Sequence, residues 1–233
     1  MSFGLICESC GAPSAPAVGI CPYCKAVMSR RQDGAAGVSS PENETVSVLN
    51  ERYETGQIED ALELTMKLFP DAELQKDVGF LLLAAKIMIE AEAPVGKMNA
   101  ALSQAFRLSP RDPAVNEYMA IVDAKTKIEH GLRDLAEQRL LEILRKSPKN
   151  PHAAFLLGSL YFWAKKSPEL AISSMETCVR ERPRFQRAWG CLGALYRSLG
   201  NYELAARAFR KCLEIEDDAN MRAFFEEQLK AVS

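Results

Sequence analysis

The stretch WGCLGALYRSLGNYELAARAF, residues 189–209, decides the fold. Its first half has the spacing W-x2-L-G-x2-Y, which puts these four side chains on one stripe of a helix. Its second half has the spacing A-x3-F, and Gly200 between the halves predicts a turn. Because Gly193 lacks a side chain, we expect a second helix to pack closely there. Ala205 is the small residue that meets Gly193, and Phe209 fills the space beside it.

The same pattern recurs along the chain. The motif Leu157, Gly158 and Tyr161 repeats Leu192, Gly193 and Tyr196 at a spacing of 35 residues. The small residue of the second helix recurs at spacings of 40, 35, 35 and 34 residues, as Ala61, Ala101, Ala136, Ala171 and Ala205. Five residues before four of these alanines a glycine predicts the turn: Gly56, Gly96, Gly131 and Gly200. Such self-similarity predicts units that stack to share one core.

The repeated unit resembles the tetratricopeptide repeat, a helix–turn–helix of about 34 residues. The predicted fold class is therefore all-α: a tetratricopeptide-repeat-like helical solenoid of about five helix–turn–helix repeats over residues 41–218. Residues 219–233 are predicted to form a capping helix that covers the last apolar surface. The apolar face of this cap carries Met221, Phe224, Phe225 and Leu229, and partner binding by the two phenylalanines is the alternative.

Several residue pairs predict where helices begin. A capping side chain followed by proline is typical of a helix start, and it occurs at Ser40-Pro41, Asp112-Pro113, Asn150-Pro151 and Ser167-Pro168. The longer spacing after the first repeat predicts a longer loop near residues 69–76. The first helix of the third repeat is predicted to extend to about Glu129 with an extra turn.

Residues 1–28 carry two C-x2-C pairs, and they resemble a small zinc ribbon or rubredoxin-like pair of knuckles. The pairs are separated by ten residues and supply four thiolates, Cys7, Cys10, Cys21 and Cys24. Four such ligands suit the tetrahedral coordination of Zn2+ and leave no open position for a catalytic water. The segment is too short to bury a core, so we expect one structural Zn2+ per chain to supply its folding free energy. Redox-active dithiols, structural disulfides and an iron site are the alternatives.

Residues 29–40 are rich in glycine, serine and alanine and lack a hydrophobic period, which predicts a flexible linker. The 233-residue chain is 48% hydrophobic and 26% charged, with a net charge of −2, as expected for a globular protein. No apolar run is long enough for a membrane span, and the start lacks the features of a signal peptide. Seven cysteines, an odd number, favour a reducing compartment, and we expect a cytoplasmic protein.

Catalytic motifs are sparse, so we expect no enzyme. Neither a phosphate-binding loop nor a G-x-S-x-G nor an H-E-x-x-H motif occurs. The two histidines, His130 and His152, are expected at the surface. Cys178, Cys191 and Cys212 are expected to pack as small apolar residues.

An aromatic stripe on the first helix of the fourth repeat is the candidate binding surface. Phe155, Phe162 and Trp163 stand at i, i+7 and i+8, apart from the stripe that meets the second helix. Packing between repeats is one interpretation. The other is a partner-binding anchor, with Lys125 nearby to suit a partner of mixed apolar and acidic character.

The resemblance implies a non-enzymatic scaffold or adaptor that binds proteins or peptides in the repeat groove, with the zinc module as a second interaction site. One alternative is a nucleic-acid-associated protein that uses the zinc module on nucleic acid. Residues 1–40 carry a net charge of only +1, from Lys25, Arg30 and Arg31 against Glu8 and Asp33, which makes nucleic acid an unfavourable partner. The other alternative is a regulator resembling bacterial envelope-biogenesis proteins that join such repeats to a rubredoxin-like module.

Overall fold

In a computed structural model, the described residues are 5–6, 13–14, 41–164, 167–216 and 219–232. The chain divides into two compact units, residues 1–40 and residues 41–233. In the first unit, β1 (Leu5–Ile6) pairs antiparallel with β2 (Pro13–Ser14), with Leu5 opposite Ser14 and Ile6 opposite Pro13. The four predicted zinc ligands lie outside the described residues.

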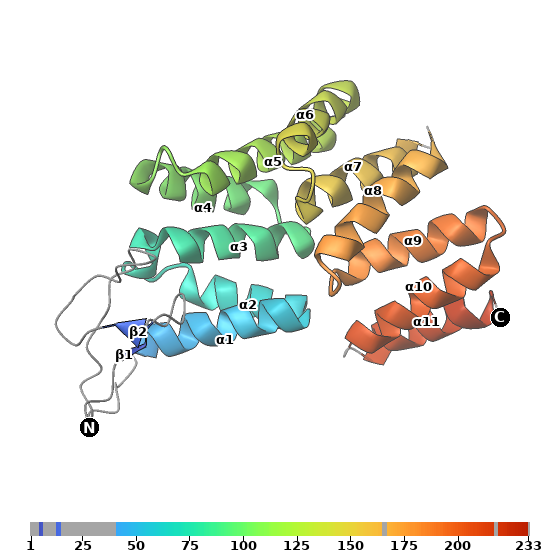
Figure 1. Ribbon diagram of the computed structural model, residues 1–233, viewed down its shortest axis with the longest axis horizontal. Helices are drawn as coiled ribbons and strands as arrows, with labels where there is room; N and C mark the ends of the chain where they lie inside the picture. Colours follow the sequence, from blue (N-terminus) through green and yellow to red (C-terminus); the bar gives the residue numbers. More distant parts are fainter. Residues whose placement is uncertain (1–4, 7–12, 15–40, 165–166, 217–218, 233) are drawn as a thin grey trace. The chain divides into compact units, whose positions relative to one another are not determined.

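The second unit consists of helices, and successive helices contact each other as five pairs (Figure 1). The pairs are α1 (Pro41–Thr55) with α2 (Ile58–Leu68), α3 (Val78–Glu90) with α4 (Val95–Leu108), α5 (Pro113–Glu129) with α6 (Arg133–Lys146), α7 (Pro151–Ala164) with α8 (Pro168–Glu181), and α9 (Gln186–Ser198) with α10 (Tyr202–Ile215). A last helix, α11 (Ala219–Lys230), contacts α10. The predicted all-α array of about five helix pairs is confirmed.

Side-chain caps fix where the first helix of the third and of the fourth pair begins. Asp112 accepts hydrogen bonds from the backbone N–H groups of Ala114 and Val115 at 2.8 and 3.1 Å, directly before Pro113. Asn150 Oδ1 accepts from the Ala153 N–H at 2.9 Å in the same way. These caps satisfy N–H groups that the helix itself leaves without an acceptor. A short 3-10 turn (Leu74–Lys76) lies in the predicted longer loop, between α2 and α3.

Three of the four predicted glycine turns are confirmed. Gly56, Gly131 and Gly200 have φ of 85°, 75° and 74°, a left-handed conformation that glycine adopts without Cβ strain. The prediction for Gly96 is wrong, because this residue lies in the first turn of α4. The left-handed residue of that connection is Glu92, with φ of 52°, so the turn comes earlier than the alanine spacing predicts.

The close approach predicted at Gly193 is present. A Cβ atom built on Gly193 would lie 2.7 Å from both Cδ1 and Cζ of Phe209, so only glycine fits against this ring. Cys178 and Cys212 are fully buried and Cys191 is half-buried, in agreement with their predicted packing.

The cap is amphipathic, but its buried face is narrower than predicted. Phe225 is 4% exposed and packs with Phe209 in a core shared by α10 and α11, and Leu229 lies against the same core. Phe224 and Met221 are 49% and 42% exposed, so these two side chains do not cover the preceding helix pair. The helical period separates Phe224 from Phe225 by about 100°, enough to turn one ring outward.

Candidate functional site

The predicted aromatic stripe is divided between core and surface. Phe155 is 3% exposed and its ring centroid lies 4.5 Å from that of Phe185. Phe155 is therefore a core residue and is not accessible to a partner in this structure, which fits the packing interpretation for this member of the stripe. Phe162 packs partly against the core, while Trp163 is 74% exposed and meets the Phe162 ring edge-on at 5.0 Å. A binding role for Phe162 and Trp163 stays a prediction.

Lys125 forms an ion pair within its own helix. Its Nζ lies 3.2 Å from Glu129 Oε1, and the side chain is only 13% exposed. The ammonium group is thus engaged within α5. Its predicted role in attracting a partner stays untested, but this pairing leaves it little charge to offer one.

A buried polar cluster joins residues from the first four helix pairs. Its members are Tyr53 of α1, Glu90 of α3, Tyr118 of α5, His152 of α7 and Arg182, which caps α8. Each is at most 7% exposed. The sequence prediction for His130 agrees with its exposed position, but the surface prediction for His152 is wrong, because this imidazole is 1% exposed.

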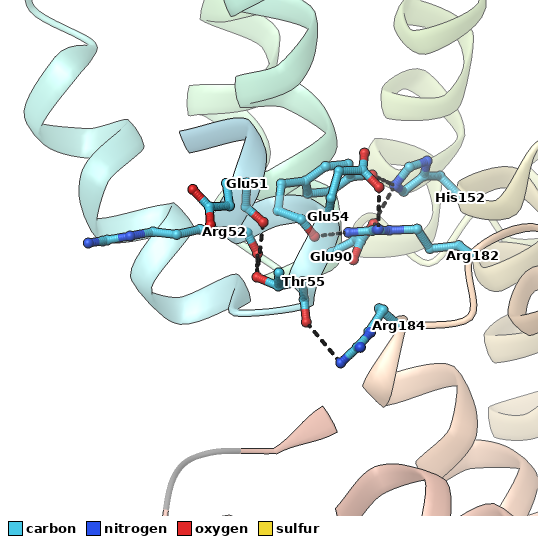
Figure 2. A network of polar contacts seen from close by, with 9 residues as sticks. Glu51, Arg52, Glu54, Thr55, Glu90, His152, Arg182 and Arg184 are labelled. Atoms are coloured by element: carbon cyan, nitrogen blue, oxygen red, sulfur yellow. Dashed lines mark hydrogen bonds and ion pairs between the residues drawn. The ribbon is translucent and has the colours of Figure 1, made fainter. Parts of the chain in front are cut away.

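The hydrogen bonds of the cluster centre on Glu90 and His152 (Figure 2). Glu90 Oε1 lies 3.0 Å from Arg182 Nε and 3.1 Å from His152 Nε2, while the Tyr118 hydroxyl lies 2.8 Å from His152 Nδ1. The Tyr53 hydroxyl also lies 3.4 Å from His152 Nε2, so both ring nitrogens have partners within the cluster. Glu90 and Arg182 form an ion pair at its centre.

Burial and hydrogen bonding act in opposite directions on Glu90. Burial raises the pKa of this carboxyl, but the hydrogen bond from His152 and the charge of Arg182 offset burial and hold the pKa below its ordinary value. Burial, together with the charge of Glu90, raises the pKa of Tyr53, so this phenol stays protonated at neutral pH. The cluster thus holds the Glu90–Arg182 ion pair, surrounded by the side chains of Tyr53, Tyr118 and His152.

Arg182 also ties the first helix pair to the connection before the fifth (Figure 2). Its guanidinium donates to the backbone carbonyl of Tyr53, lies 3.8 Å above the Tyr53 ring and lies 3.3 Å from Glu54 Oε2. The neighbouring turn makes a second contact, since a Cβ atom on Gly56 would lie 3.0 Å from Ile215 Cγ2 at the end of α10. Helix pairs one and five are therefore in contact.

A cavity of about 610 Å³ lies at this contact. The turn between α1 and α2 and the start of α2 form one wall. The end of α3, the start of α9, the end of α10 and one face of α11 form the others. The residues that line it are Gly56, Gln57, Ile58, Glu59, Asp60, Glu90, Phe185, Gln186, Arg187, Ile215, Glu216, Met221 and Phe225. Sequence reasoning missed this cavity, because its walls come from segments more than 100 residues apart.

The polar groups of the cavity are mostly acidic. Four carboxylates, Glu59, Asp60, Glu90 and Glu216, line it together with one guanidinium, Arg187. Arg187 is already paired with Glu92 outside the lining. Glu90 Oε2 is buried and makes no hydrogen bond among the described side chains, although the nearby Tyr53 hydroxyl influences this carboxylate.

The described thiols are not reactive groups. Burial raises the pKa of Cys191 to about 11 and raises the pKa of Cys178 and Cys212 as well, so all three are protonated at neutral pH. In the part of the chain that the structure describes, no three His, Cys, Asp or Glu side chains come together as a metal site. Among the same residues, no helix combines the length and apolar content that a membrane span requires.

Comparison with known proteins supports the repeat fold. Residues 187–218, the last helix pair, match the family model of the tetratricopeptide repeat. A thermophilic tetratricopeptide repeat protein from Thermus thermophilus shares 17% identity over 81% of this chain and 99% of that chain, with a TM-score of 0.51. The chain therefore has the tetratricopeptide-repeat fold. No curated protein matches it.

Two further solved structures are similar at lower TM-scores. A tetratricopeptide repeat protein from Parabacteroides merdae shares 22% identity over 66% of this chain, with a TM-score of 0.47, and the chain covers 59% of that protein's length. YrrB, described as a tetratricopeptide repeat protein with an unusual peptide-binding site, shares 16% identity over 78% of this chain and 90% of that chain, with a TM-score of 0.41.

Proposed function

We propose that the chain is a non-enzymatic adaptor that binds a protein or peptide partner on its repeat array. The observation that carries this proposal is the cavity between the first and fifth helix pairs, which combines an apolar interior with charged groups. Its volume of about 610 Å³ falls within the range of about 300–1,000 Å³ of pockets that bury a ligand. Such a cavity can take one or two side chains of a partner as anchors.

The titratable groups near the cavity support a binding function rather than catalysis. The buried thiols are protonated, and the buried imidazole is engaged on both ring nitrogens. The described cysteines Cys178, Cys191 and Cys212 form no disulfide, which is consistent with a reducing compartment, and we propose the cytoplasm.

The partner role can be tested by affinity capture with a matched pair of variants on α11. Met221 lines the cavity and is 42% exposed, while Phe224 is 49% exposed and does not line it. Met221→Trp should fill the cavity and abolish retention of the captured protein, whereas Phe224→Trp should retain it, with similar melting temperatures. No protein retained above the bare matrix, or equal retention by both variants, would contradict the assignment.

We further propose that Cys7, Cys10, Cys21 and Cys24 hold one structural Zn2+ and that this module is a second interaction site. The strands β1 and β2 pair at Ile6 and Pro13, directly before and after the segment that contains the first cysteine pair. Four thiolates suit Zn2+, and the bound metal would supply the folding free energy of a segment this short.

Elemental analysis of chain purified under reducing, chelator-free conditions tests this module. We expect about one equivalent of zinc in the parent and in Cys191→Ser, and a loss in Cys7→Ser, because a structural site needs all four ligands. Less than half an equivalent of zinc in the parent would refute the proposal. Iron in place of zinc would correct the identity of the metal.

A further inference from the structure

We propose that the cavity between the first and fifth helix pairs accepts a basic segment, a lysine or arginine side chain flanked by aliphatic side chains. This inference rests on the proposed peptide-binding function and specifies the chemistry of the partner. It differs from the sequence prediction, which placed an acidic partner beside Lys125.

The charge of the lining favours a cation. Four carboxylates against one guanidinium give the lining a net charge of −3, although the whole chain carries only −2 over 233 residues. The one guanidinium, on Arg187, is neutralised by Glu92, so it offers little attraction to an anion. Carboxylates gathered along the walls of a concave site concentrate their field in it and raise the local concentration of cations.

One carboxylate of the lining is deeply buried. Glu90 Oε1 accepts from both His152 and Arg182. The Tyr53 hydroxyl is near enough to influence the carboxylate, while Oε2 itself makes no hydrogen bond. A buried carboxylate oxygen without a donor is uncommon, because leaving it unsatisfied costs free energy. A cation of the partner in the cavity would be attracted by the charge of this carboxylate, together with the exposed carboxylates of Glu59 and Asp60.

Most of the remaining lining is apolar, and it requires apolar side chains next to the basic residue of the partner. Ile58, Phe185, Ile215 and Phe225 are each at most 8% exposed yet line the cavity, and Met221 is the accessible apolar side chain at its edge. Aliphatic residues beside the basic one would bury their surface on this lining. A cation with no apolar neighbours would leave these contacts unmade.

The full-length chain can be tested with three fluorescein-labelled octapeptides in a fluorescence anisotropy titration. The probes alternate leucine with arginine, with glutamate, or with glutamine. We expect saturable binding of the leucine–arginine peptide, at least about tenfold tighter than the leucine–glutamine peptide, and weakening as salt rises. Equal or tighter binding of the leucine–glutamate peptide would overturn the charge preference while leaving peptide binding intact.

A pair of double variants places the binding at the cavity. Glu59→Gln with Asp60→Asn removes two carboxylates from the lining, and both residues are exposed, so the fold should be unaffected. We expect the affinity for the leucine–arginine peptide to fall about tenfold. The control, Glu129→Gln with Glu142→Gln, removes two exposed carboxylates that do not line the cavity and should leave the affinity unchanged.

An equal loss of affinity in both double variants would show that the peptide responds only to the net charge of the chain. That result would overturn the assignment of the binding site to the cavity. No binding of any of the three peptides, with a partner still captured by the parent chain, would overturn this inference alone. No peptide binding together with no captured partner would overturn the proposed function itself.

Discussion

Replacing two glycines of the same helix tests the packing between α9 and α10. Gly190 and Gly193 lie three residues apart in α9, but their surroundings differ. A Cβ atom on Gly190 would lie 3.5 Å from the nearest atom of Phe225, an ordinary contact. A Cβ atom on Gly193 would lie 2.7 Å from two atoms of the Phe209 ring, which would have to move.

The expected magnitudes follow from two opposing contributions. Alanine in place of glycine inside a helix stabilises it by about 0.8–1 kcal/mol, and this gain is the same at both positions. Overpacking of a buried contact costs about 1–3 kcal/mol, and this cost arises only at Gly193. Gly190→Ala should therefore raise the free energy of unfolding by up to about 1 kcal/mol, and Gly193→Ala should lie about 1–3 kcal/mol below it.

Urea denaturation followed by tryptophan fluorescence can measure this difference in the last helix pair, where both glycines lie. The chain has two tryptophans, and Trp189 lies in α9, so a Trp163→Phe parent reports on the last helix pair. A repeat array can unfold in parts, which makes a local reporter necessary. Equal transition midpoints for Gly190→Ala and Gly193→Ala would refute the close approach between α9 and α10.

A double-mutant cycle identifies the group responsible. Phe209→Leu removes the ring that a Cβ atom at Gly193 would meet. If that ring causes the cost, Gly193→Ala should destabilise the Phe209→Leu chain by at least about 1 kcal/mol less than it destabilises the parent. Additive effects would assign the cost to the backbone instead.

Two further predictions concern the polar cluster and the aromatic pair. Arg182→Ala leaves the buried Glu90 carboxylate without its charged partner and should cost about 3–5 kcal/mol of unfolding free energy, while Arg180→Ala, at an exposed position, should cost under about 0.5 kcal/mol. Because the pKa of Glu90 lies below its ordinary value of 4.5, ionised Glu90 stabilises the fold above about pH 4.5. This stabilisation is lost as the pH falls through the lower folded-state pKa, so Glu90→Gln should flatten the acid limb of a stability–pH curve, and an unchanged limb would contradict the coupling. Trp163→Ala should leave the melting temperature unchanged and reduce partner capture, whereas Phe162→Ala should lower the melting temperature, and full capture by Trp163→Ala would remove it as an anchor.

The repeat fold was predictable because its determinants are local and periodic. The spacing of Gly193, Ala205 and Phe209 encodes one helix–helix contact within 17 residues, and the caps at Asp112 and Asn150 act within three residues. The glycine spacing gave a wrong turn position in the second repeat, because a residue other than the glycine adopts the left-handed conformation there. Gly96 has the expected spacing, but Glu92 adopts the left-handed conformation that ends the connection after α3.

The polar cluster and the cavity were not predictable from spacing, because they depend on contacts between distant repeats. Arg182 donates to a carbonyl 129 residues away, and Glu90 and His152 are separated by 62 residues. Nothing in the sequence around His152 distinguishes a buried imidazole from a surface one at a helix start.

The buried cluster lies beside one end of the predicted aromatic stripe, since His152 and Phe155 both contact Phe185. The first four helix pairs contribute to it, and its five side chains are in contact with one another. Phe155 is buried beside them against Phe185. Because these groups are already paired, a partner that bound there would have to replace buried hydrogen bonds, at a cost of about 1–3 kcal/mol for each group left unsatisfied. Of the five cluster members only Glu90 lines the cavity, so a partner bound in the cavity would leave the hydrogen bonds of the other four members in place.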